Sequence, residues 1–266
     1  AKKKGFKNHF YISPQVWAWK ESRVNQMKKY LDDLYVILPF EKDFFKKKHN
    51  FSVKFVGHPL LDIEFKGNNK KKFFLKNELS LTKSIIALLP GSRIQEIRHI
   101  LPIFVSVSKL FPEYEFVVAG APGINSKSYI DLVKTSKIKI VRNQTYELLV
   151  NAKAALVSSG TATLETALFN VPQVVCYKSS FLSYHIAKRL IKLKFISLVN
   201  LILNREAVKE LIQNSFTKEE LYKELEYILS ESGKKQIKED YETLRKKLGE
   251  GGASKKTARY IYNSIK

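Results

Sequence analysis

Two glycine-containing turns carry the side chains of this chain that are best suited to chemistry. The first turn spans residues 90–93 and follows the apolar run 84–89, and the second spans 158–165 and follows the apolar run 154–157. An apolar run, a tight turn and a helix start leave backbone N–H groups and the positive end of a helix dipole free, which suits a phosphate. Two such turns in one domain predict a diphosphate site, and therefore an enzyme that handles a nucleotide-linked substrate.

Arg93 is the predicted anion ligand of the first turn, together with Gly91 and Ser92. A cation at the start of a helix opposes the helix dipole and costs about 0.3–1 kcal/mol, which a bound anion would offset. The alternative is an ordinary surface arginine. Ser92 is also expected to cap the helix 94–111, with Gln95 completing a capping box.

Glu165 is the predicted ribose ligand of the second turn. We expect it in the first turn of the helix 162–169, where a glutamate is usually a capping-box residue. That box needs Ser or Thr three residues earlier, but the chain has Ala162 there, so the carboxylate is available to ribose hydroxyls. A plain interaction with the helix dipole is the alternative. The predicted phosphate ligands of this turn are Ser159, Gly160, Thr161, Ala162 and Thr163.

Asn200, Arg205 and Glu206 complete the predicted binding residues. Asn200 stands in the apolar run 197–202, where its amide needs a partner from the backbone or from a ligand. Arg205 and Glu206 lie at a predicted turn before a helix over 207–213. The sequence lacks the spaced His, Cys or Asp patterns that are typical of metal sites, so we expect no metal and no organic cofactor.

Strands and helices alternate from residue 84 onward, which predicts an α/β fold with a parallel sheet and helices on both faces. Ligands of such sheets bind at the carboxyl ends of the strands, where both turns lie. The predicted strands are 84–89, 115–119, 138–141, 154–157 and 173–177, and the predicted helices are 94–111, 126–136, 145–151, 162–169, 217–229, 236–248 and 254–265.

A smaller α/β region precedes this sheet. Its predicted strands are 9–13, 34–38 and 53–56, and its predicted helices are 21–31 and 41–48. His58, between Gly57 and Pro59, is interpreted as a hinge residue rather than a metal ligand. The predicted domains are a Rossmann-like domain over 1–57, a linker over 58–72, a second Rossmann-like domain over 73–230, and C-terminal helices over 231–266 that pack back toward the first domain.

Composition narrows the class of protein. The 266 residues are 44% hydrophobic, enough for a packed core, and carry a formal net charge of +22. Such a charge suits nucleic acid or an anionic membrane, and the alternative is a general compositional bias toward Lys, Asn, Ile and Phe. Lysines spread along the chain, rather than clustered with aromatic residues, argue against nucleic acid. No apolar run reaches the ~18–20 residues that span a bilayer. The one cysteine, Cys176, is expected to be a buried thiol in a reducing compartment.

Taken together, these segments resemble lipid-A-disaccharide synthase, an inverting glycosyltransferase of family 19. The aromatic run Ser13-Pro14-Gln15-Val16-Trp17-Ala18-Trp19 is specific to that family, whereas the Gly-Thr-x-x-x-Glu helix start is shared more widely among nucleotide-sugar transferases. The other matching segments are 11–12, 38–41, 55–59, 89–93 with Glu96, 159–165, 187–190, 197–201 and 205–206.

The resemblance implies a GT-B fold with two Rossmann-like domains facing across a cleft, the N-terminal one incomplete. It implies transfer of 2,3-diacylglucosamine from UDP to 2,3-diacylglucosamine 1-phosphate, giving the β-1,6-linked lipid A disaccharide 1-phosphate and UDP. By this similarity Arg93 holds the diphosphate, Glu165 the ribose and residues 158–163 a phosphate. Asn200 and Arg205 would lie near the sugar or the diphosphate.

Further expectations follow from the resemblance. About the first hundred residues of a full member would precede the match, so we expect the general base outside this chain and assign no catalytic residue. The protein would lie on the cytoplasmic face of the inner membrane, with 181–203 as a candidate lipid contact or, alternatively, a core helix and strand, and would form a homodimer through its C-terminal helices. The alternatives are another GT-B nucleotide-sugar enzyme, such as an epimerase, and a basic nucleic-acid-binding protein.

Overall fold

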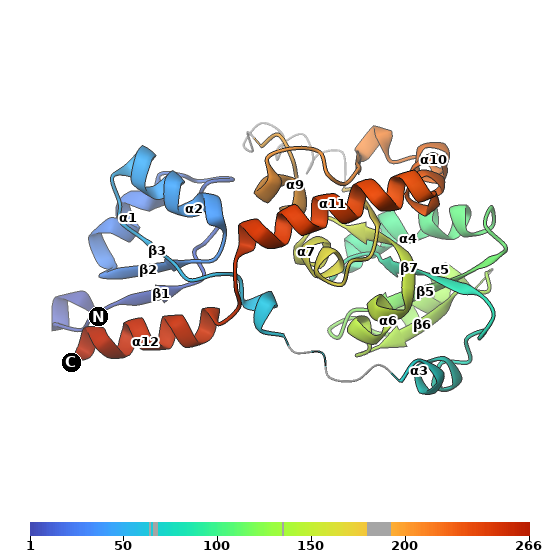
Figure 1. Cartoon of the computed structure of the whole chain (residues 1–266), viewed down its shortest axis with the longest axis horizontal. Helices are drawn as coiled ribbons and strands as arrows, with labels where there is room; N and C mark the ends of the chain where they lie inside the picture. The colour runs from blue at the N-terminus through green and yellow to red at the C-terminus, as the bar shows by residue number, and fades with distance from the viewer. Residues whose placement is uncertain (64, 66–68, 135, 180–192) are drawn as a thin grey trace. The chain divides into compact units, whose positions relative to one another are not determined.

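The computed structural model describes residues 1–63, 65, 69–134, 136–179 and 193–266 (Figure 1). These residues form two compact units, and each unit is described by itself. Within the described ranges, the small unit comprises residues 1–63, 193–194 and 244–266, and the large unit comprises residues 65–179 and 195–243. The predicted lipid-contact segment 181–203 falls largely outside the described residues.

The large unit contains a six-stranded sheet in which every neighbouring pair of strands is parallel, as predicted. The central strands are fully buried because their sequences are continuous runs of Val, Ile, Leu and Ala. In sheet order the strands are β6 (Lys139–Arg142), β5 (Tyr114–Gly120), β4 (Ser84–Leu89), β7 (Ala152–Ser158), β8 (Gln173–Tyr177) and β9 (Glu210–Ile212).

Helices cover both faces of this sheet (Figure 1). On one face, α3 (Lys70–Lys76) and α6 (Thr145–Asn151) bury Phe73, Phe74, Leu148 and Leu149 against β4, β5 and β7. On the other face, α4 (Ile94–Ser108) and α10 (Lys218–Leu229) pack against β7 and β8. The remaining helices of this unit are α5 (Lys127–Val133), α7 (Thr161–Leu168), α9 (Leu198–Leu203) and the first part of α11 (Glu231–Leu248).

The small unit has a three-stranded parallel sheet in the order β1 (His9–Tyr11), β2 (Asp33–Val36) and β3 (Lys54–Phe55). Its core joins Val16, Leu34 and Phe45, among others, in one apolar cluster. Its other long elements are α1 (Arg23–Tyr30), α2 (Pro39–Asp43), a π-helical turn (Phe44–Lys48) and α12 (Ala253–Ile265), and 3₁₀ turns span Lys2–Lys4 and Pro59–Asp62.

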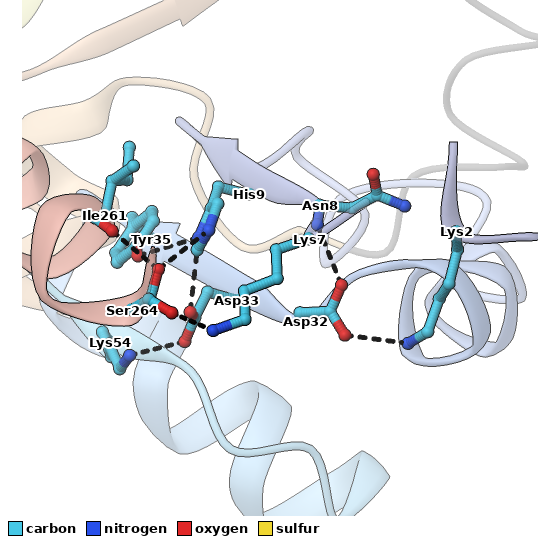
Figure 2. A network of polar contacts seen from close by, with 10 residues as sticks. All are labelled: Lys2, Lys7, Asn8, His9, Asp32, Asp33, Tyr35, Lys54, Ile261 and Ser264. Carbon is cyan, nitrogen blue, oxygen red and sulfur yellow. Dashed lines mark hydrogen bonds and ion pairs between the residues drawn. The ribbon is translucent and has the colours of Figure 1, made fainter. Parts of the chain in front are cut away.

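A polar network joins α12 to the amino ends of β1 and β2 (Figure 2). The Oγ atom of Ser264 lies 3.1 Å from Nε2 of His9, and Nδ1 of the same ring lies 3.1 Å from the hydroxyl of Tyr35. At the opposite end of α12, the carboxylate of Asp62 accepts bonds from the N–H groups of Gly252, Ala253 and Ser254. Both ends of α12 are therefore fixed to the small unit.

Three predictions about elements were wrong. Residues 207–213 were expected to be a helix, but Glu210–Ile212 form strand β9, because Val208 and Leu211 are buried beside β8. Helix α3 replaces part of the predicted linker, since Phe73 and Phe74 bury themselves in the core. Helix α11 begins at Glu231 rather than at 236, and it includes Gly233.

Candidate functional site

The first turn leads from the end of β4 into the start of α4. Gly91 has φ +114, a left-handed conformation that favours glycine, and Arg93 is the N-cap residue of α4. The predicted capping box of Ser92 and Gln95 is therefore wrong, because the N-cap residue of α4 is Arg93 rather than Ser92. Glu96 occupies the position expected for the box, and its Oε2 accepts a bond from the N–H of Ser92 at 3.2 Å.

Arg93 lies at the start of the helix, as predicted, and its side chain faces solvent. The Arg93 side chain is 82% exposed, and its Nη1 donates to Oε1 of Glu96 at 3.2 Å. This is the only hydrogen bond that the guanidinium makes among the described residues, so Nε and Nη2 are available to an anion.

The second turn leads from the end of β7 into α7, with Gly160 as the N-cap residue. No side chain of the described residues caps this helix, which leaves its first N–H groups for a ligand. Gly160 and Thr161 are exposed, whereas the hydroxyl of buried Thr163 donates to the carbonyl of Gly160 at 2.8 Å. The exposed backbone, rather than the Thr163 side chain, is thus the accessible part of this turn.

Glu165 is the fifth residue of α7, just beyond its first turn, so the expectation of a first-turn position was wrong: the helix begins at Thr161, one residue earlier than predicted. Its carboxyl is half-buried, and burial raises its pKa above the usual range, while a bond from Tyr146 acts in the opposite direction. The hydroxyl of Tyr146, on α6, lies 3.5 Å from Oε1 of Glu165. The ring of Tyr146 packs on Phe169, with 5.2 Å between the ring centroids.

The two turns lie at one edge of the sheet because β4 and β7 are neighbours. The strands run parallel, and Leu89 pairs with Val157 immediately before the two turns. The N-terminus of α4, with Arg93, and the N-terminus of α7 therefore both lie at this edge of the sheet. Two positive helix ends and a guanidinium at one edge form a setting suited to a diphosphate.

Asn200 is completely buried, and its amide is fully used by the protein itself. Its Nδ2 donates to the carbonyl of Val208 and to Glu210, both at 2.8 Å. Its Oδ1 accepts from the N–H groups of Ala207 at 2.8 Å and Val208 at 3.0 Å. The sequence left open whether the backbone or a ligand is the partner of this amide, and the structure supplies the backbone. Asn200 thereby fixes the loop between α9 and β9.

Arg205 and Glu206 follow α9 and pair with other protein side chains. The guanidinium of Arg205 forms an ion pair with buried Asp240 of α11, and Glu206 lies 3.6 Å from Lys209. A direct link does connect the second turn to the segment before α9, because the hydroxyl of Ser159 donates to the carbonyl of Ile196 at 3.0 Å. The roles predicted for Arg205 and Glu206 in binding stay predictions.

Sequence reasoning named Glu96 only as part of the family match, and it did not single out Tyr146 or Glu210, which also contact predicted site residues. Glu210 accepts from the N–H groups of Ile196 and Ser197, both at 2.9 Å, and so fixes the start of α9. The spacing of Glu96 three residues after Arg93 is a signal that the sequence offered. Tyr146 and Glu210 are far from their partners along the chain and carried no such signal.

Two segments of the small unit that match the family, 13–19 and 38–41, meet through Trp17 and Glu41. The indole N–H donates to Oε1 of Glu41 at 3.0 Å, and Oε2 accepts from the N–H groups of Ile37 and Leu38. Glu41 is 1% exposed, and burial raises the pKa of its carboxyl. These bonds fix the N-terminus of α2 within the small unit.

His58 is also a structural residue. Its Nδ1 accepts from the N–H of Leu60 at 3.2 Å, and burial lowers its pKa to about 4. In the described part of the chain, no group of three or more His, Cys, Asp or Glu side chains is placed to hold a metal ion. Independence from metals and cofactors stays a prediction.

Comparison with known proteins gives the same family along the whole chain. A family model described as lipid-A-disaccharide synthetase matches residues 1–263. The lipid-A-disaccharide synthase of Persephonella marina is 35% identical over 276 residues, which cover 98% of this chain and 72% of the relative. That of Coxiella burnetii is 36% identical over 270 residues, covering 100% of this chain and 71% of the relative.

Solved structures agree on the fold. A UDP-GlcNAc 2-epimerase from Neisseria meningitidis superposes with a TM-score of 0.62 at 13% identity, covering 98% of this chain and 70% of that one. A glycosyltransferase from Rickettsia africae superposes with a TM-score of 0.58 at 13% identity, covering 97% and 69%. These neighbours share the GT-B fold that the sequence predicted, and at such identities they show the fold alone.

Proposed function

The chain belongs to the lipid-A-disaccharide synthetase family, and we propose that its large unit binds the UDP moiety of the sugar donor at the two glycine turns. The family's reaction is the glycosyl transfer that forms the lipid A disaccharide in lipopolysaccharide biosynthesis. The observation that carries the proposal is the emergence of both turns at the carboxyl ends of the adjacent strands β4 and β7.

The diphosphate of the donor is assigned to the first turn and to the N-terminus of α7. During transfer, negative charge grows on the departing UDP, so preorganised donors at this point stabilise the transition state. Arg93 supplies a guanidinium on a side chain that is 82% exposed, and the N–H groups after Gly160 supply a second set of donors.

The ribose is assigned to Glu165. Its carboxylate lies one turn into α7, behind the exposed N-terminus that would take the phosphate, so a nucleotide could reach both. Half-burial strengthens a hydrogen bond between a carboxylate and the ribose hydroxyls, because water competes less there. Glu165 contacts the hydroxyl of Tyr146, which limits the orientations of the carboxylate before the nucleotide binds.

The proposed substrates are UDP-2,3-diacylglucosamine and 2,3-diacylglucosamine 1-phosphate, and the proposed place of action is the cytoplasmic face of the inner membrane. Both substrates carry acyl chains and partition into a bilayer, and the net charge of +22 favours an anionic lipid surface. No helix within the described residues combines the length and the hydrophobicity needed to cross a bilayer.

A homodimer formed through the C-terminal helix completes the proposal. Three large side chains of α12 are exposed although they are apolar or aromatic: Tyr260 at 42%, Tyr262 at 56% and Ile265 at 64%. Exposed groups of this kind on one helix are suited to pairing with a second copy. Sedimentation of the purified protein over a range of concentrations tests this part independently.

The transfer itself is tested with the complete gene product. Disaccharide formation is measured from the UDP-linked and the 1-phosphate monosaccharide lipids in detergent, with and without a chelator. Arg93→Ala should lower turnover by about 10²-fold or more, the loss seen when one stabilising donor is removed. Glu165→Ala should lower turnover at limiting donor concentration, because the ribose hydroxyls lose their acceptor. Lys109→Ala, at the far end of α4, is the matched control and should leave turnover unchanged. Full turnover in both site variants would contradict the assignment.

A further inference from the structure

The carboxylate of Glu96 fills the inner side of the first turn. A Cβ atom added to Gly91 would lie 2.4 Å from Oε2 and 2.9 Å from Cβ of Glu96. Gly91 is thus glycine for two reasons, its φ of +114 and the space that Glu96 occupies. The side chain of Glu96 is only 22% exposed, which means that it is held against the turn rather than extended into solvent.

Each carboxylate oxygen of Glu96 holds a different part of the turn. Oε2 accepts the backbone N–H of Ser92, and Oε1 accepts Nη1 of Arg93. The first bond fixes the backbone just before the helix, and the second fixes the direction of the guanidinium. Glu96 therefore couples the shape of the turn to the position of the one cation in it.

We propose that Glu96 is a positioning residue that preorganises Arg93 to receive the diphosphate, an inference that rests on the function proposed above. A free arginine side chain loses rotamer freedom when it binds a ligand, and a partner that orders it beforehand removes part of that cost. The arrangement leaves Nε and Nη2 of Arg93 for the ligand, since only Nη1 is engaged among the described residues.

For removal of Glu96, the proposal predicts a change in UDP affinity opposite to the one that charge repulsion alone predicts. Removing a carboxylate beside an anion site should strengthen anion binding if charge alone decides, because like charges repel. If positioning decides, Glu96→Ala should weaken UDP binding by about 2- to 10-fold, the range that ordering one flexible side chain spans. Glu96→Gln should fall between, because its amide oxygen still accepts the N–H of Ser92 but lacks the charge that attracts Arg93.

Titration calorimetry with UDP and with uridine tests this inference. UDP binding should weaken in Glu96→Ala, while uridine binding, which involves no phosphate, should match the wild type. In an Arg93→Ala background, Glu96→Ala should weaken UDP binding less than it does in the wild type, because the bond to Arg93 is already absent and only the bond to Ser92 is lost. Thermal unfolding establishes whether each variant is folded. If Glu96→Ala does not fold, the UDP affinity of Glu96→Gln tests the inference instead.

The outcomes separate the two proposals. If wild-type protein does not distinguish UDP from uridine, the diphosphate assignment fails and this inference fails with it. If the wild type prefers UDP but Glu96→Ala binds UDP equally or more tightly, only the inference fails. An equal loss of UDP and uridine binding would also overturn it, because that result describes general damage to the large unit.

Discussion

The hydroxyl of Tyr146 lies 3.5 Å from Oε1 of Glu165, and this contact joins α6 to the helix that follows the second glycine turn. Burial raises the pKa of both groups, and the nearby Glu165 carboxylate raises that of Tyr146 further. A carboxylate with a raised pKa takes up a proton at a higher pH than an ordinary glutamate. The ribose-binding role proposed for Glu165 therefore predicts a pH dependence.

Uridine binding should weaken as the pH is lowered, beginning at a higher pH than an ordinary glutamate would cause. The reason is that protonation converts an acceptor-only carboxylate into a group that also donates. Uridine is used because it has no phosphate that titrates. Tyr146→Phe removes a bond that lowers the pKa of Glu165, so the midpoint should move to still higher pH. Glu165→Gln should bind uridine independently of pH, and a wild type without pH dependence would contradict the role.

Gly91→Ala should destabilise the protein by roughly 1–3 kcal/mol from the left-handed backbone alone, with a further cost from the collision with Glu96. Urea unfolding measures the loss. The same substitution in a Glu96→Ala background should cost less, because the colliding carboxylate is absent. Gly123→Ala is the matched control, since nothing lies within 4 Å of the added Cβ and its φ is not positive. Equal losses from Gly91→Ala in both backgrounds would show that Glu96 does not fill the turn.

Asn200→Ala should lower the free energy of unfolding by at least about 2 kcal/mol, because the buried N–H groups of Ala207 and Val208 lose their acceptor. Urea unfolding again gives the value, with exposed Asn263→Ala as the control. A variant as stable as the wild type would mean that these N–H groups find another acceptor and that the loop does not depend on Asn200.

The buried imidazole of His58 should make the folded protein less stable in acid. Burial holds the pKa of His58 at about 4, against 6.5 for a free histidine, so the folded imidazole stays neutral where the unfolded one takes up a proton. The free energy of unfolding should therefore fall as the pH drops from 6.5 to about 4. His58→Asn keeps an acceptor for the N–H of Leu60 without titrating, and should lose less stability over the same window. Equal losses of unfolding free energy in the wild type and in His58→Asn would rule out His58 as a source of the acid instability.

The sequence was sufficient to predict the sheet of the large unit where apolar runs are long and glycine turns follow. Strands β4 and β7, Gly91 and Gly160 fall at the predicted places because buried parallel strands leave continuous hydrophobic runs. Strand β9 was missed because three residues at a sheet edge carry no periodicity, and its burial depends on β8, more than thirty residues earlier.

The residue that caps a helix was harder to predict than the presence of the helix. Ser92 has the better capping side chain, yet the N-cap residue of α4 is Arg93, and Glu96 bonds back to the N–H of Ser92. Asn200 shows a similar limit, since an amide in an apolar run signals a buried partner without saying which one. The contacts of Glu165 with Tyr146 and of Asn200 with Glu210 depend on tertiary packing, which local sequence does not encode.

The placement of the diphosphate at both turns is tested most directly by the backbone amide signals of the large unit during titration with UDP and with uridine. The account predicts that UDP shifts the amide signals of residues 91–96 and 159–163 together, and that uridine leaves the signals of 91–96 unchanged. UDP binding that shifts other residues while the amides of both turns keep their positions would contradict it.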